Sequence, residues 1–306
     1  MSESILSQPQ FHNEEAAYAH VETRIWPNGP VCPRCGVLGR SGKLQGKSTR
    51  IGVYKCYDCR KPFTVKVGTI FESSHIPLRI WLQAIFLVAA SKKGISANQL
   101  HRTLGVTLKS AWFLGHRIRE AMRDDTGLLG GGGSIVEADE VYLGPKPKRA
   151  KEKRGGQSVV SLVQRDGKTR SFHVADVSGD NLKPILLANI AKDSHPMTDG
   201  AQIYRVVGKE FAHHEHTNHQ QGEYAKPSKV AGVSAHSNTV ESFFAILKRG
   251  ITGTYHHISK EHLQRYCDEF DFRFSNRKAL GVDDVTRADR LLKAVVGKRL
   301  TYQMSA

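Results

Sequence analysis

Glu241 and Lys248 are the two residues whose types and spacing first suggest chemistry. They lie seven positions apart in HSNTVESFFAILK, a stretch with the pattern of a helix. Seven steps of about 100° bring a side chain back to within about 20° of its first direction, so the two groups share a face. A carboxylate with a cation two turns beyond it can hold a metal ion and the phosphate backbone bound to that metal. The competing interpretation is structural, because Asn238 followed three residues later by Glu241 is a capping-box-like pattern.

Two further carboxylates precede this helix in the chain. Asp139 is the middle acidic residue of IVEADEVYL, where strand alternation puts Glu137, Asp139 and Val141 on one face. Asp199 stands before a glycine at the expected end of a short strand, HPMTDG. Either residue alone is explained by solvation or by a turn. Together with Glu241 they follow the order that a two-metal phosphoryl-transfer site could use, and Mg²⁺ prefers such hard oxygen ligands.

Two cysteine pairs form a second set. Cys32 and Cys35 lie in CPRCG, Cys56 and Cys59 lie in CYDCR, and twenty residues separate the pairs. This spacing is typical of a four-thiolate zinc site, with two disulfides as the alternative. A basic chain without a secretory signal favours a reducing compartment and therefore zinc. Cys267 lies on an amphipathic helix and is expected to be a core thiol.

Helices are expected after the zinc ribbon. IWLQAIFLVAA carries an apolar stripe, and SANQLHRTL, GVT and LKSAWFLGHRIREAM read as a helix-turn-helix. Its second helix offers five candidates for contact with DNA, which are Lys109, His116, Arg117, Arg119 and Arg123. Helix pairs of this kind also occur as structural hairpins that do not contact DNA. The zinc ribbon, which is rich in Lys and Arg, either lies on a phosphate backbone or only supports the neighbouring domain.

The remaining segments indicate a mixed α/β domain. GLLGGGGS is expected to be a flexible linker, followed by three strands with antiparallel pairing and by the helix NLKPILLANIA. The basic segment GPKPKRAKEKRGG is expected to be a mobile loop that reaches phosphates. The cluster of His213, His214, His216 and His219 fits no metal-ligand template and is expected to be a strand and loop near the site. Ser259 is expected to cap a last helix, whose buried stripe is Leu263, Tyr266, Cys267, Phe270 and Phe274.

Composition narrows the partners. The chain has 306 residues, 39% of them hydrophobic, which is enough for one main domain and one or two small ones. Lys and Arg (45) exceed Asp and Glu (29), giving a formal net charge of +16. This excess favours nucleic acid over anionic membrane as the partner. The N-terminus lacks the order of a signal peptide and the longest apolar run is too short for a bilayer, so a cytoplasmic protein is expected.

VEADEVYLG, TDG and HSNTVESFFAILKRGITGTYHHISKEHLQRYCDEFDFRFSNR, with the zinc ribbon upstream, resemble the insertion sequence 1595 (ISXO-type) transposases. These belong to the DDE group of RNase H-like enzymes, and the resemblance covers nearly the whole chain. It implies an α/β fold with an RNase H-like catalytic domain preceded by a zinc ribbon and a helix-turn-helix. It also implies that Asp139, Asp199 and Glu241 are the acidic triad and Lys248 the basic residue after it. Some relatives carry Asn at or near the third acidic position, and this chain has both Asn238 and Glu241.

The resemblance further implies cleavage at transposon ends and strand transfer into target DNA with two Mg²⁺ ions, for which Mn²⁺ could substitute, and a structural Zn²⁺. The expected DNA contacts are Lys109, Arg117, Lys248 and Arg249, and the expected state is a nucleoid-associated homo-oligomer on double-stranded DNA. The alternative is a zinc-containing DNA-binding regulator with an inactive catalytic domain, which has no reason to keep the acidic set with Lys248. The expected divisions are an N-terminal segment (1–30), zinc ribbon (31–64), helix-turn-helix (76–124), Gly-rich linker (125–134), catalytic domain (135–280) and C-terminal tail (281–306).

Overall fold

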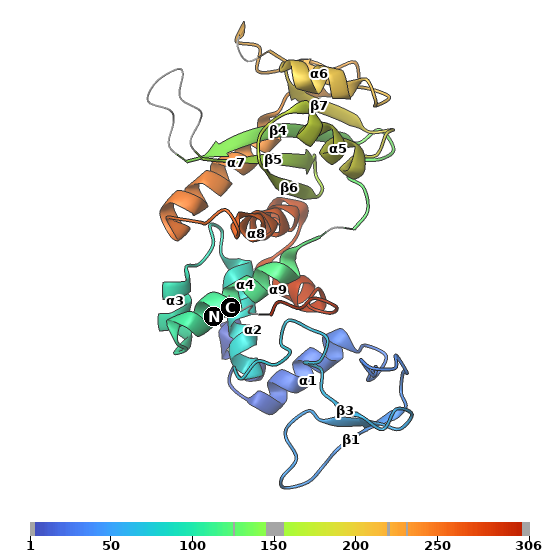
Figure 1. Cartoon of the computed structure of the whole chain (residues 1–306), viewed down its shortest axis with the longest axis vertical. Helices are drawn as coiled ribbons and strands as arrows, with labels where there is room; N and C mark the ends of the chain where they lie inside the picture. The colour runs from blue at the N-terminus through green and yellow to red at the C-terminus, as the bar shows by residue number, and fades with distance from the viewer. Residues whose placement is uncertain (1–3, 125, 145–155, 219–220, 231, 302–306) are drawn as a thin grey trace. The chain divides into compact units, whose positions relative to one another are not determined.

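The chain forms two compact units in a computed structural model that describes residues 4–124, 126–144, 156–218, 221–230 and 232–301 (Figure 1). Unit 1 consists of Met1–Met122 and Val282–Ala306, and unit 2 of Arg123–Gly281. The basic segment expected to be a phosphate-binding loop lies almost entirely outside the described residues. Within the described ranges, no helix is both long and apolar enough to cross a bilayer.

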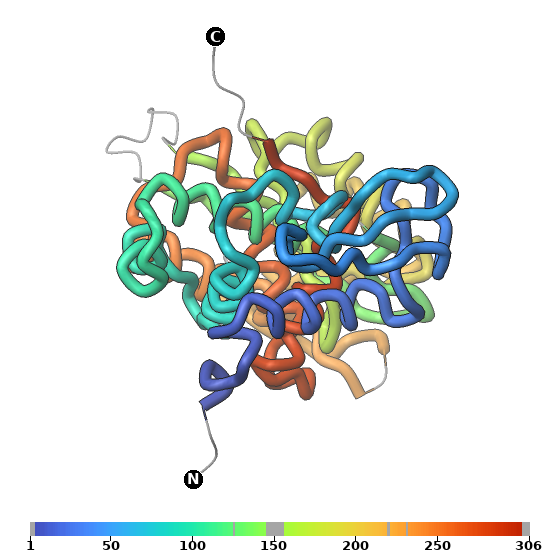
Figure 2. Tube along the Cα trace, turned by 90° about the horizontal axis from the view of Figure 1, so that it is seen from below, coloured from blue at the N-terminus to red at the C-terminus, as the bar shows by residue number. Residues whose placement is uncertain are grey.

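Unit 1 combines a small antiparallel sheet with helices that pack around α2. Trp81, Ile85 and Val88 of α2 are buried, as the apolar spacing predicted, and α1, α4 and α9 contact this helix. In Figure 2 the N-terminal part of the unit runs from blue to green, and its C-terminal part is red. Its elements are η1 (Ile5–Ser7), η2 (Pro9–Phe11), α1 (Glu14–Ile25), β1 (Ser41–Lys43), β2 (Tyr54–Cys56), β3 (Pro62–Phe63), α2 (Leu78–Ala90), α3 (Ala97–Leu104), α4 (Leu108–Met122) and α9 (Asp284–Lys293).

Helix ends in unit 1 follow local chemistry. The Ser96 hydroxyl accepts the Gln99 N–H at 3.2 Å and so begins α3, and Gly105 ends that helix in the left-handed conformation with φ of 65°. A three-residue turn then leads to α4, as the helix-turn-helix pattern predicted. The N-terminus of α2 is closed from a distance, because the Glu14 carboxylate accepts the Leu78 N–H at 2.6 Å.

Residues 281–306, expected to be a C-terminal tail, instead contain α9. The Asp283 carboxylate caps this helix by accepting the Thr286 N–H at 2.7 Å. Leu291 and Leu292 are buried, and α9 packs against α1 and α2. The expectation failed because α9 is short and its apolar face is narrow, so its pattern alone did not separate it from a polar tail. This segment is therefore a structural part of unit 1.

Unit 2 is built on a mixed five-stranded sheet in the order β6-β5-β4-β7-β8. β4, β5 and β6 pair antiparallel, as predicted, whereas β7 runs parallel to both β4 and β8. Its elements are β4 (Ile135–Leu143), β5 (Gln157–Gln164), β6 (Thr169–Val174), α5 (Gly179–Asn189), β7 (His195–Asp199), α6 (Gln202–Gly208), β8 (Glu215–Thr217), β9 (Lys226–Pro227), β10 (Ser234–Ala235), α7 (Asn238–Gly250), η4 (Ile251–Tyr255), α8 (Leu263–Ser275) and η5 (Lys278–Leu280).

Helices cover both faces of this sheet. Successive strand residues point to opposite sides, and both sides carry apolar side chains that the helices bury. Val136 and Ala138 of β4 belong to the core shared with α5 and α6. Val141, on the opposite face of the same strand, belongs to the core shared with α7 and α8 (Figure 1). The predicted alternation of IVEADEVYL is thus confirmed, and Asp139 lies on the α7 side.

The expected flexible linker is packed against unit 2. Leu129 is completely buried and exchanges backbone hydrogen bonds with Asn189 and Ala191, of 2.7 and 2.9 Å. The glycines that follow adopt positive φ, and the Gly131 N–H donates to the Ser194 hydroxyl at 2.9 Å. The prediction of a linker was wrong, because glycine content reports conformational permissiveness and not whether the segment is bonded to its surroundings.

Helix α8 begins at Leu263 and is not capped by Ser259, which corrects a third expectation. Leu263, Cys267, Phe270 and Phe274 are buried as predicted, whereas Tyr266 is only half-buried. Complete burial raises the pKa of the Cys267 thiol, first through desolvation and then through nearby acidic groups, as befits a core thiol.

Candidate metal sites and active site

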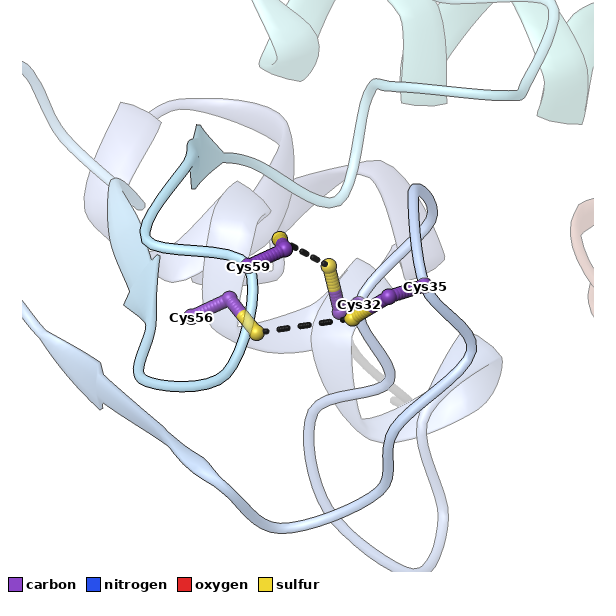
Figure 3. Close-up of side chains that lie close together, drawn as sticks. All are labelled: Cys32, Cys35, Cys56 and Cys59. Carbon is purple, nitrogen blue, oxygen red and sulfur yellow. Dashed lines mark hydrogen bonds between the residues drawn. The ribbon is translucent and has the colours of Figure 1, made fainter.

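The four paired cysteines meet in unit 1 (Figure 3). The Sγ atoms of Cys32 and Cys59 are 3.7 Å apart, those of Cys35 and Cys56 are 3.6 Å apart, and all four lie within 4.8 Å of one another. Four sulfurs bound tetrahedrally at about 2.3 Å from zinc would be about 3.8 Å apart. The cysteines are free thiols, and their arrangement fits a structural zinc ion.

Two tight turns create this arrangement. Gly36 and Arg60, each directly after the second cysteine of a pair, have positive φ values of 73° and 59°. The ribbon's own core is small: Cys32, Cys56 and Phe63 are buried, and Trp26 and Tyr54 pack against them. A module with so little apolar burial depends on a metal for stability.

The first two predicted acidic residues lie on neighbouring parallel strands. Glu137 of β4 is the register partner of Met197 of β7. Asp139 and Asp199 each lie two positions further along these strands, on the same faces. Asp199 is the last residue of β7, as predicted, and its Oδ1 accepts the Ala201 N–H at 3.0 Å.

The third acidic residue, Glu241, comes from the first turn of α7. Glu241 and Lys248 are both exposed and share a face as predicted, about a quarter to a third of a turn around the helix from the buried Val240, Phe243 and Leu247. The capping-box interpretation is not supported. Ser237 is the N-cap residue, makes no side-chain cap bond, and donates its hydroxyl to Glu241 Oε1 at 3.3 Å.

The carboxyl group of Asp139 has a strongly raised pKa. Its pKa is raised to about 8, chiefly through desolvation by burial and also through the negative charges of Glu140, Asp199 and Glu241. The Glu140 N–H, which donates to Asp139 Oδ1 at 2.8 Å, acts in the opposite direction. Crowded carboxylates of this kind suit a divalent cation, which would relieve their repulsion. They are more widely spaced than the thiols, since among the described residues only the cysteines form a compact group of three or more ligand atoms.

The structure shows one acidic residue whose importance sequence reasoning missed. Glu137 is completely buried, accepts the Arg165 Nε–H at 2.6 Å, and accepts the N–H groups of Thr239 and Val240 at the start of α7. The signal available in the sequence was its position on the same strand face as Asp139 and the core residue Val141. A carboxylate on a core-facing side needs a partner.

The residues expected to contact DNA separate into two groups. Lys109, at the start of α4, and Lys248 and Arg249, near the end of α7, are exposed. Arg117 is buried, and its guanidinium donates to the carbonyls of Ile70, Glu72 and Leu300 at 2.8 to 3.0 Å. The prediction that Arg117 contacts DNA is therefore wrong, because its hydrogen-bond donors are used within unit 1.

The histidine cluster lies beside Asp199, as expected, because β8 pairs with β7 and Thr217 is the partner of Asp199. His214 contacts the Thr198 hydroxyl at 3.0 Å, and burial, followed by the neighbouring histidines His216 and His195, lowers its pKa to about 4. His219 lies outside the described residues.

Comparison with known proteins agrees with this architecture. Residues 128–275 match the model of an ISXO2-like transposase domain, and residues 12–62 match that of a transposase zinc-ribbon domain from the same family. The chain belongs to the insertion sequence 1595 transposases. It is also 27% identical over 267 residues to a protein in transposable element ISH50 of Halobacterium salinarum, covering 81% of this chain and 86% of that relative.

The two family matches fall in different units. The transposase match contains β4, β7 and α7, which carry the three acidic residues, and the zinc-ribbon match contains all four cysteines. Helices α2, α3 and α4 lie between the two matched regions.

Proposed function

We propose that this protein is a DNA transposase that cuts DNA at transposon ends and joins the freed ends to target DNA. In this proposal Asp139, Asp199 and Glu241 hold divalent cations, and Lys248 steadies the DNA. The observation that carries it is the convergence of three carboxylates from β4, β7 and α7, close enough for Asp199 and Glu241 to raise the pKa of Asp139. We also propose that unit 2 is RNase H-like, on the basis of the family match and its mixed sheet.

The chain's residues have distinct roles in this reaction. Two Mg²⁺ ions, or Mn²⁺ in their place, would supply Lewis acidity for the water, the attacking 3′-hydroxyl and the leaving oxygen. Asp139 must release its proton to become a ligand, and a bound cation favours that release. Lys248 and Arg249 lie on the exposed part of α7 and provide positive charge for a phosphate backbone. No covalent bond between protein and DNA is required.

DNA binding in this proposal involves both units. The net charge of +16 suits a polyanion. Lys109 and Arg102 are exposed on α4 and α3, and the first turns of the second helix are where a helix-turn-helix meets base edges. We further propose a homo-oligomer assembled on double-stranded DNA at the nucleoid, since an element has two ends to be cut and joined.

The test is cleavage and strand joining on a labelled duplex that carries the element's own ends, with binding measured in parallel. Asp139→Asn, Asp199→Asn and Glu241→Gln should each bind DNA and fail to cut it. Glu241→Gln should also leave α7 folded, because Glu137 and not Glu241 binds the first N–H groups of that helix. If the wild-type protein binds its ends but never cuts them with Mg²⁺ or Mn²⁺, the protein is a DNA-binding regulator instead.

A further inference from the structure

Glu137 closes the N-terminus of α7 from the neighbouring strand. Its Oε2 accepts the backbone N–H groups of Thr239 and Val240 at 2.8 and 3.0 Å. Its Oε1 accepts the Thr239 hydroxyl at 2.9 Å and Arg165 Nε at 2.6 Å. A negative charge at this position also complements the helix dipole. One carboxylate of β4 therefore fixes both where α7 begins and how it is placed on the sheet.

Arg165, which binds Glu137, also contacts β7 and the segment that leads into α7. Its Nη2 lies 3.2 Å from Met197 Sδ on β7 and donates to the His236 carbonyl at 3.0 Å. Its Nη1 donates to the Ser234 carbonyl in β10 at 2.9 Å. The planar guanidinium thus joins β7 and the segment leading into α7 to the carboxylate of Glu137.

Glu137 and two of the residues that it and Arg165 contact each lie two positions before a proposed metal ligand. On the paired strands, Glu137 precedes Asp139 by two residues and Met197 precedes Asp199 by two. Thr239 precedes the third ligand, on α7, by the same interval. We infer that Glu137 and Arg165 form a positioning pair that holds the three proposed metal-binding carboxylates at their mutual spacing. This inference rests on the proposed function.

The pair acts behind the ligands and touches neither DNA nor cation. Glu137 has no exposed surface, and the Arg165 side chain is only 17% exposed. Removing a hydrogen-bonded partner behind a metal ligand weakens metal binding or activity by about 10- to 100-fold. A pair that only stabilised the fold would leave the metal affinity of the folded protein unchanged. That difference separates positioning from simple stabilisation.

The structure provides a matched control for this test. Glu269 on α8 is also completely buried and forms an ion pair with the buried Arg273 four residues later. It belongs to the same unit, and its ion pair lies within α8, which carries none of the proposed ligands. Glu137→Gln and Glu269→Gln therefore remove the same charge from the same kind of environment.

The experiment measures Mn²⁺ binding to the full chain without DNA, by electron paramagnetic resonance, at a temperature where each variant is folded. The Mg²⁺ dependence of end cleavage is measured alongside. We expect Glu137→Gln to need about tenfold or more Mn²⁺ for half-saturation and Glu269→Gln to match wild type. If Glu137→Gln does not fold, Arg165→Lys serves instead, because one ammonium cannot reach all of the guanidinium's partners.

Three outcomes are distinguishable. Wild-type Mn²⁺ affinity in both Glu137→Gln and Arg165→Lys overturns the inference, and so does an equal loss in Glu269→Gln. Failure of the proposed function looks different, since wild type would then cut no DNA and Asp139→Asn would not alter Mn²⁺ binding.

Discussion

The two candidate metal sites are built in opposite ways. In the ribbon, four thiols from two short turns lie within a span of 27 positions, and a bound zinc ion would supply much of the module's stability. In unit 2, three carboxylates come from two strands and a helix, and Asp139 is 102 positions before Glu241. The sheet has an apolar core on each of its faces. Loss of metal should therefore unfold the first site and only disable the second.

The largest expected effect is on the ribbon. Cys56→Ser should abolish zinc binding and unfold the ribbon, because the binding free energy of a structural zinc, about 10 to 16 kcal/mol, is also folding free energy. Metal analysis and thermal melting would show loss of zinc with unit 2 still folded. Cys267→Ser, which changes a cysteine remote from the cluster, should keep its zinc. Unchanged zinc in Cys56→Ser would refute the four-cysteine site.

The second effect is catalytic without being structural. Asp139→Asn should lower cleavage by about a thousandfold, since lost metal binding removes several kcal/mol of transition-state stabilisation. Its melting temperature at neutral pH without metal should not fall, because a carboxyl with a pKa of about 8 is already protonated there and Asn is neutral too. Asp271→Asn is the control, as this carboxyl is also buried with a raised pKa but bonds Ser171 on β6. Cleavage as fast as wild type in Asp139→Asn would contradict the comparison.

The third effect is on the pH dependence of stability. Burial raises the pKa of Asp271 to about 8, against the opposing hydrogen bonds from Ser171. Between about pH 4 and pH 8 the folded chain then keeps a proton that the unfolded chain has released, so stability falls as pH rises. The slope contributed is up to about 1.4 kcal/mol per pH unit. Urea unfolding at pH 5 and pH 8 without divalent cations should show a smaller difference in Asp271→Asn, and an unaltered difference would argue against a protonated Asp271.

The smallest effect distinguishes an exposed cation from a buried one within the same helix. Lys109→Ala should weaken DNA binding a few-fold and reduce the slope of log affinity against log salt by about 1, with no loss of stability. Arg117→Met should do the reverse, lowering stability by about 1 to 3 kcal/mol because three carbonyls lose their donor. If both substitutions reduced the slope of log affinity against log salt equally, Arg117 would contact DNA after all.

The sequence predicted the features that depend only on residues close together in the chain. Cysteine spacing identified the zinc site, and strand alternation put Asp139 on the face opposite Val136 and Ala138. The shared face of Glu241 and Lys248 followed from helix geometry alone. These features need only the period of one element or the length of one turn.

What the sequence could not predict depends on partners far along the chain. The role of Glu137 requires that the turn at Arg165 and the start of α7 meet on β4. The burial of Arg117 requires Leu300, 183 positions later. Helix periodicity gives the faces of α4 but not which face the C-terminal segment covers.

The packing of α9 against α2 has a consequence for how the protein is made. Unit 1 begins and ends the chain, so all of unit 2 is synthesised before the last 25 residues of unit 1 exist. A nascent chain that has reached Gly281 holds every element of the sheet, while the apolar side of α2 still awaits Leu291 and Leu292. A chain that stops between Gly281 and Leu291 would therefore carry a complete unit 2 attached to an incomplete unit 1.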